Sequence, residues 1–279
     1  MIASFLIALR EGIEAALIVG IILSYLRKVD ARTLVKPVYF GVALGVLASV
    51  AVGALFMLLA VEFEGTLEQV FEGATMFLAA AILTTMILWM RKNSLAYSED
   101  LRKRVAFALS EKHSIGLSAL AFVSVFREGI ETVLFLGSAS FTSTGLQLIV
   151  GGALGLGLAV VMGLAIVKYS VRLDLKKFFN VTGILLILFA AGLVAHGIHE
   201  FEEAGVFAPI VEHVWDTNWL VNDHSDLGQT LTALFGYNGD PSLVEVLGYV
   251  GYWLVLLVWI YRDTAVALFR KMTASTTPT

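Results

Sequence analysis

The chain contains no cysteine and few charged residues. Without cysteine, disulfides, thiolate metal sites and iron–sulfur clusters are excluded, so any metal must be held by oxygen and imidazole ligands. Only 15% of the 279 residues are charged and the formal net charge is -4, so we expect no nucleic-acid partner. By contrast, 58% of the residues are hydrophobic and the mean hydropathy is +0.84, which is typical of integral membrane proteins.

Seven apolar stretches are each long enough to cross a membrane as a helix, which needs about 20 mainly apolar residues. They predict an all-α integral membrane protein with spans at residues 2–26, 37–61, 66–90, 115–137, 145–168, 178–201 and 244–261. The first stretch lacks a preceding basic segment and carries charges inside it. We therefore interpret it as a retained span and not as a signal peptide.

Charged residues gather at opposite ends of the predicted spans. Lysine and arginine cluster in the segments 27–36, 91–112, 168–177 and 262–271, whereas the other connections are acidic, at 62–68 and 202–226. Because positive loops stay on the cytoplasmic side, the N-terminus is predicted outside and the C-terminus in the cytoplasm.

A five-residue motif occurs twice, as Arg10-Glu11-Gly12-Ile13-Glu14 and as Arg127-Glu128-Gly129-Ile130-Glu131. The glycine pattern at 41–45 also returns at 151–155. Units of three spans cross the membrane an odd number of times, so two successive units run oppositely and form an inverted repeat. We predict a first three-helix repeat at 1–91, a cytoplasmic amphipathic linker at 92–114, an inverted second repeat at 115–203, an extracytoplasmic loop at 204–243, and a seventh helix with a cytoplasmic tail at 244–279.

The motif glutamates stand three residues apart, so a helix places both carboxylates on one face. Charged groups at membrane depth cost several kcal/mol, roughly 2.5 or more on insertion scales, and therefore indicate function. Four carboxylates from two helices suit a hard cation. The candidate metal ligands are Glu11, Glu14, Glu128 and Glu131, with Arg10 and Arg127 as charge partners. The alternative is a purely structural ion pair between arginine and glutamate in each helix.

Two further polar series are candidate outer or accessory ligands. Glu64, Glu68 and Glu72 follow one helical face and suggest a ladder that attracts cations, although a solvated helix end would explain the first two. His196, His199, Glu200 and Glu203 form a second stripe whose spacing suits a transition metal. Polar side chains reaching the membrane interface are an equally open explanation for this stripe.

The doubled motif resembles the iron permease family, which includes fungal oxidase-coupled high-affinity permeases and the permease of bacterial Efe-type iron uptake systems. The pair His199-Glu200, the loop Trp215-Asp216 and the segment Leu234-Phe235-Gly236-Tyr237 look like the bacterial branch. The resemblance implies import of iron across the cell inner (cytoplasmic) membrane through the motif glutamates, as iron(III) after oxidation outside. It also implies periplasmic or extracellular iron-oxidising and iron-delivering partners, with iron as cargo and no permanently bound cofactor.

Other functions remain open from the residues alone. Oxygen ligands select a class of ion and not one element, so a permease for another divalent cation, such as manganese or lead, is the nearest alternative. A membrane haem-binding electron-transfer subunit using His196 and His199 is an alternative of another class. The sequence holds no phosphate-binding or nucleophile motif, so we expect a transporter and not an enzyme.

Overall fold

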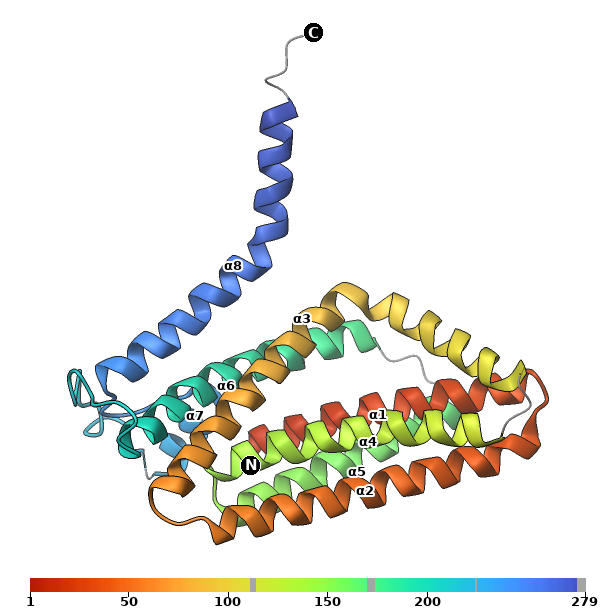
Figure 1. Ribbon diagram of the computed structural model, residues 1–279, viewed down its shortest axis with the longest axis horizontal. Helices are drawn as coiled ribbons and strands as arrows, with labels where there is room; N and C mark the ends of the chain where they lie inside the picture. Colours follow the sequence, from red (N-terminus) through yellow and green to blue (C-terminus); the bar gives the residue numbers. More distant parts are fainter. Residues whose placement is uncertain (111–113, 170–173, 224, 275–279) are drawn as a thin grey trace.

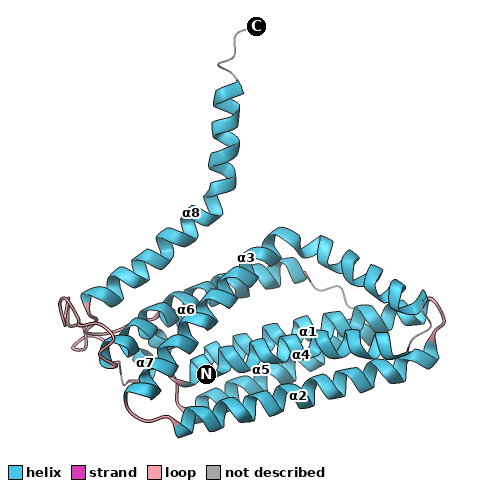
Figure 2. Cartoon of the chain, viewed as in Figure 1, coloured by secondary structure: helices cyan, strands magenta, loops and turns pink. Residues whose placement is uncertain are grey.

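The structure, a computed structural model, describes residues 1–110, 114–169, 174–223 and 225–274. Figure 2 shows that helix dominates these residues, which contain no β-strand. The elements are α1 (Ile2–Lys28), the 3-10 turn η1 (Arg32–Leu34), α2 (Val35–Glu62), α3 (Thr66–Ser110), α4 (Ser114–Ser140), α5 (Gly145–Tyr169), α6 (Leu175–Glu203), α7 (Asp226–Phe235) and α8 (Leu243–Ala274). All seven predicted apolar stretches lie inside these helices.

Five helical stretches are long and apolar enough to cross a membrane: Arg32–Glu62, Thr66–Arg91, Gly145–Ile166, Lys176–Glu203 and Leu243–Arg262. The helices α1 and α4 each carry three charged motif residues within otherwise apolar sequence. Large apolar side chains cover the outward faces of α2, α5 and α8, where Leu58 is 67%, Ile149 69% and Val258 70% exposed. Apolar surface of this extent requires lipid and not water around it, as in a multi-pass membrane protein.

Helices of the two predicted halves are interleaved. The pairs with the most extensive packing are α1 with α5, α2 with α4, and α3 with α6, so each pair joins one helix from each half (Figure 1). Glycines permit the close approach: a side chain at Gly41 of α2 would strike the backbone of Ser118 in α4, and one at Gly151 of α5 would strike the backbone of Met1 beside α1.

The two ends of the bundle differ in charge. One end, which we call the acidic end, carries the α2–α3 turn with Glu64, the end of α6 with Glu202, and the segment between α6 and α8 with Glu212. The opposite end, which we call the basic end, carries the α1–α2 connection with Arg27, Lys28, Arg32 and Lys36. In Figure 1 the acidic end is at the left and the basic end at the right.

The helix α3 continues past the predicted boundary at residue 91 and turns across the basic end (Figure 1). Val105 in this second part is fully buried in a cluster with Leu26 of α1, Val38 of α2 and Leu117 of α4. The predicted linker is therefore the end of a long helix as far as Ser110. Its residues 111–113, and the tail at 275–279, lie outside the described residues.

The segment predicted as a loop at 204–243 contains the helix α7. The Ser225 side chain begins this helix by accepting a hydrogen bond from the Gly228 amide at 3.0 Å, and Gly236 ends it with a left-handed φ of 67°. A side chain at Gly192 of α6 would lie 2.8 Å from Gly236. Because Gly192 precedes the end of α6 by three turns, α7 reaches well into the bundle.

Candidate metal-transport site

The two motifs meet near the middle of α1 and α4, which run in opposite directions (Figure 1). With a rise of 1.5 Å per residue, Glu11 and Glu14 lie about 13 and 18 Å from the start of α1. Glu131 and Glu128 lie about 13 and 18 Å from the end of α4, at the same end of the bundle. The carboxylates of both motifs therefore lie at the same level along the bundle, near the middle of α1 and α4.

In the first motif one arginine serves both glutamates. The Arg10 guanidinium is 2.8 Å from Glu11 Oε1 through Nη1 and 2.9 Å from Glu14 Oε1 through Nη2. The same two nitrogens lie 3.6 and 3.2 Å from the sulfur atoms of Met86 and Met90 in α3. Only 2% of the Arg10 side chain is exposed, so the charged group is enclosed. Here the ion pairs are internal to the protein.

The second motif has the same pairing in a more open setting. Arg127 Nε donates to Glu131 Oε1 at 2.8 Å and lies 3.9 Å from Glu128 Oε1. The Arg127 side chain is 47% exposed, whereas those of Glu128 and Glu131 are only 3% and 13% exposed. The carboxylates therefore turn inward while their arginine lies at the rim.

Three motif carboxylates come together across the helix interface. Oxygen atoms of Glu11, Glu128 and Glu131 all lie within 4.8 Å of one another. Each of these three glutamates has a buried oxygen, Oε2, without a hydrogen-bond partner among the described residues. Buried carboxylate oxygens without partners are costly, and a cation in their midst removes that cost.

The charges of the whole motif cluster also favour a cation. When all four carboxylates are ionised, the two guanidinium groups leave two negative charges. A group of carboxylates with this excess binds hard or borderline metal ions through oxygen. The fourth predicted ligand, Glu14, pairs with Arg10 and stands beside this three-carboxylate group.

Each motif glycine allows the opposing half to approach. A side chain on Gly12 would lie 2.6 Å from Ala159 Cβ in α5, and one on Gly129 would collide with Ser49 in α2. These glycines therefore set the distance between α1 or α4 and the helix that packs against it. In both copies the motif glycine thus allows close packing of two helices.

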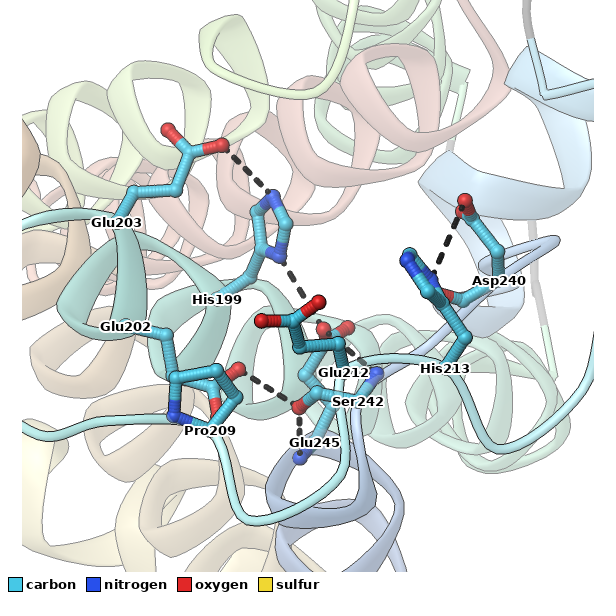
Figure 3. Close-up of a pocket in the computed structure, with 9 residues that line it drawn as sticks. All are labelled: His199, Glu202, Glu203, Pro209, Glu212, His213, Asp240, Ser242 and Glu245. Atoms are coloured by element: carbon cyan, nitrogen blue, oxygen red, sulfur yellow. Dashed lines mark hydrogen bonds and ion pairs between the residues drawn. The ribbon is translucent and has the colours of Figure 1, made fainter.

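A second polar group lies at the acidic end, in a pocket of about 260 Å³ (Figure 3). His199 of α6 is 3.2 Å from Glu203 Oε1 through Nε2 and 3.1 Å from Glu245 Oε1 through Nδ1. Glu245 belongs to the first turn of α8 and is 4% exposed. Ligand atoms of His199, Glu202 and Glu245 lie within 4.8 Å of one another.

The predicted histidine–glutamate stripe is only partly brought together. His199 and Glu203 are in contact, but His196 Nδ1 is 3.0 Å from the Gly192 carbonyl oxygen, which occupies one of its two ring nitrogens. Glu200 is half-buried and interacts electrostatically with Glu68 across the α3–α6 interface.

The predicted ladder lies at the acidic end, with Glu64 in the turn before α3 and Glu68 and Glu72 on α3. Glu64 and Glu68 are exposed, and Glu72 is half-buried. Glu72 interacts electrostatically with Glu200 and Glu203 of α6, and Gln69 Nε2 donates to Glu203 Oε2 at 3.0 Å. The ladder and the α6 stripe therefore form one acidic surface between α3 and α6.

Two pocket residues were missed by the sequence reasoning. Glu202 was assigned only to an acidic loop, and Glu245 lay unremarked at the start of the last span. Glu245 is 46 residues away from its partner His199, so helical spacing gives no sign of their contact. A glutamate inside an apolar span is the one signal that points to Glu245.

Together these features define a class: a multi-pass helical membrane protein with carboxylates gathered inside its helical bundle, an arrangement typical of ion transporters. Comparison with known proteins gives the family. A family model described as "Iron permease FTR1 family" matches residues 1–273. The chain belongs to this family, which confirms the resemblance inferred from the doubled motif.

Curated relatives agree with this membership. The protein named "Ferrous iron permease EfeU" from Yersinia pestis is 36% identical over 280 residues, covering 98% of this chain and 99% of the relative. The protein of the same name from Escherichia coli O157:H7 is 36% identical over 260 residues, covering 92% and 93%. These relatives are named as transporters and not as enzymes. No solved structure matches the chain.

Proposed function

We propose that this protein imports iron across the cytoplasmic membrane, with the motif carboxylates as the ligands of the ion in transit. The observation that carries the proposal is the group formed by Glu11, Glu128 and Glu131, whose oxygens lie within 4.8 Å of one another at membrane depth. The enclosed oxygens without hydrogen-bond partners give a cation several ligands at once. Membership of the iron permease family supports iron as the cargo.

The two halves are proposed to be inverted repeats. The packing contacts support this because they occur in matched pairs. Gly45 of α2 approaches Phe122 and Val125 of α4, while Gly155 of α5 approaches Phe5 and Ala8 of α1. Phe5 and Phe122 both stand five residues before the motif arginine. Seven crossings are proposed from the apolar stretches, and the positive-inside rule puts the acidic end outside and the basic end in the cytoplasm. Opposite tilting of such halves would expose the motif cluster to each side in turn.

The ladder of Glu64, Glu68 and Glu72 is proposed to attract cations to the acidic end. These side chains and the neighbouring Glu200 and Glu203 concentrate negative charge where α3 meets α6. A cleft lined by one sign of charge raises the local concentration of its counter-ion. In the central cluster, we propose that part of the negative charge is offset by Arg10, which pairs with Glu14, and by Arg127.

The proposal has two forms, which differ in the oxidation state of the transported iron. The family resemblance predicts iron(III), oxidised outside by a partner protein, whereas the bacterial relatives carry "ferrous" in their names. All-oxygen ligands suit iron(III) and divalent ions alike. Supplying iron(II) and iron(III) separately to the isolated protein distinguishes the two forms.

The test is radioactive iron uptake into proteoliposomes. The variants Glu11→Gln, Glu128→Gln and Glu131→Gln keep the shape of each side chain and remove one negative charge. We expect each to lower uptake at least about tenfold, since a transported ion loses a ligand. Glu62→Gln, at an exposed position of the acidic end, is the matched control and should transport as wild type.

Two results would count against the proposal. Wild-type uptake by all three motif variants, at equal protein insertion, would reduce the motifs to structural ion pairs. Uptake of Mn²⁺ or Pb²⁺ with equal efficiency, and complete inhibition of iron uptake by either ion, would favour the permease for another divalent cation.

A further inference from the structure

The pocket at the acidic end holds ligands of a different chemical type from the motif cluster. We propose that His199, Glu202 and Glu245 form a binding site for a divalent transition-metal ion, which loads the cargo before it reaches the motif carboxylates (Figure 3). Metal binding at this site is independent of the proposed function, whereas the loading role rests on it.

The spacing of the ligand atoms fits a bound ion. His199 Nδ1 and Glu245 Oε1 are 3.1 Å apart, and an atom of Glu202 lies within 4.8 Å of both ligands. Nitrogen and oxygen ligands about 2.1 Å from a transition-metal ion lie about 3.0–3.4 Å apart in neighbouring coordination positions. An ion therefore fits between the imidazole and the carboxylate with little movement of either.

Glu202 offers an unused ligand atom. Its Oε2 accepts a hydrogen bond from the Ser242 hydroxyl at 2.6 Å, which fixes the carboxylate. Its Oε1 is buried and lacks a hydrogen-bond partner among the described residues. The oxygen atoms of buried carboxylates are seldom left unpartnered. This orphan oxygen of Glu202 is thus an independent observation that supports cation binding at the site.

Outer contacts hold the third ligand in place. Asn238 Nδ2 donates to Glu245 Oε2 at 2.8 Å, and the Ser242 amide donates to Glu245 Oε1 at 3.2 Å. Such supporting hydrogen bonds orient the ligands of metal sites. These contacts connect α6, the segment before α8 and α8 itself. The site is therefore complete only when these three elements pack together.

The types of ligand in this site favour one class of metal ion. One imidazole with carboxylates suits borderline divalent ions such as Fe²⁺, Co²⁺ and Zn²⁺, whereas the motif cluster offers oxygen alone. Further carboxylates of Glu203, Glu212 and Asp240 line the pocket and leave it negative. The pocket volume of about 260 Å³ accommodates an ion together with water ligands.

The experiment is a Co²⁺ titration of the purified full-length protein in detergent, followed by the visible ligand-field bands of bound cobalt. We expect His199→Gln and Glu202→Gln to raise the Kd for Co²⁺ at least about tenfold. Glu62→Gln should leave the Kd unchanged. The triple variant Glu11→Gln/Glu128→Gln/Glu131→Gln, which lacks the central ligands, should keep the bands of the outer site.

Two outcomes would overturn the site. The first is a wild-type Kd in both His199→Gln and Glu202→Gln, and the second is loss of every cobalt band in the triple variant while its circular dichroism stays that of the wild type. Glu202→Gln is the more informative substitution because its orphan oxygen makes no hydrogen bond that folding requires. If the triple variant transports iron normally, the proposed function fails while the titration still decides the outer site.

Discussion

The two copies of the Arg-Glu-Gly-Ile-Glu motif have the same sequence and different surroundings. The Arg10 side chain is 2% exposed and that of Arg127 is 47% exposed, although each arginine pairs with the glutamate four residues on. The arginine of the first copy is therefore buried inside the protein, while the arginine of the second copy is partly exposed at the surface. Identical motifs need not do identical work in the two halves.

The neighbouring helix accounts for part of this difference. Arg10 lies against the sulfur atoms of Met86 and Met90 in α3. In the proposed repeat, Gly73 and Ile87 of α3 are equivalent to Gly183 and Gly197 of α6. The contact of Gly73 with Gly197 and the contact of Gly183 with Ile87 are then equivalent contacts, which supports this alignment. In that alignment Met86 corresponds to His196 and Met90 to Glu200. The first half thus covers its arginine with methionine side chains, and the corresponding positions of the second half carry polar residues.

The largest expected effect comes from removing the buried arginine. Arg10→Ala leaves Glu11 and Glu14 without their enclosed counter-ion, and breaking a buried pair costs roughly 3–5 kcal/mol. We expect a marked fall in the thermal unfolding temperature in detergent, and a clearly smaller one for Arg127→Ala. The control is Arg32→Ala, whose side chain is 83% exposed. Equal falls for Arg10→Ala and Arg127→Ala would abolish the contrast between the copies.

A moderate effect is expected from the motif glycines. Gly129→Ala brings a methyl group against Ser49, and overpacking of this kind costs roughly 1–3 kcal/mol. The second substitution Ser49→Gly removes the colliding atoms and should restore the unfolding temperature and iron uptake. Gly12→Ala, which meets Ala159 Cβ, should be restored in the same way by Ala159→Gly.

The restoring substitutions also test the pairing of the halves. Each must act on its own motif: Ser49→Gly should not restore Gly12→Ala, nor Ala159→Gly restore Gly129→Ala. Restoration by the wrong partner, or by neither, would contradict the matched contacts between α1 and α5 and between α4 and α2.

The smallest effect concerns the acidic surface. Glu72 of α3 corresponds to Thr182 of α6, so one half carries a charge that the other lacks. A single carboxylate near solvent is worth up to about 1 kcal/mol, so Glu72→Gln should raise the iron concentration for half-maximal uptake roughly two- to fivefold. The maximal rate should stay unchanged, and the difference should shrink at high salt. A changed maximal rate would mean that Glu72 belongs to the central path.

The sequence predicted what depends on local pattern. The apolar runs predicted where seven helices lie, although α3 and α8 extend past the predicted ends, and the motif glutamates followed from charges inside those runs. The assembly of Glu11 with Glu128 and Glu131 was predicted through the repeated motif, because equal motifs in opposed helices can meet. The contact of His199 with Glu245 and the penetration of α7 beside Gly192 depend on chain folding between distant segments, which no local spacing encodes.

The exposed apolar face of α2 has a consequence for the choice of lipid. It extends from Tyr39 to Val61, about 33 Å along the helix, slightly more than the hydrocarbon thickness of a typical bilayer. Shorter acyl chains would force this helix to tilt further, and α4, which is packed against it through Gly41 and Gly45, would tilt with it. We therefore expect acyl-chain length to shift the motif carboxylates of α4 without a change in any side chain.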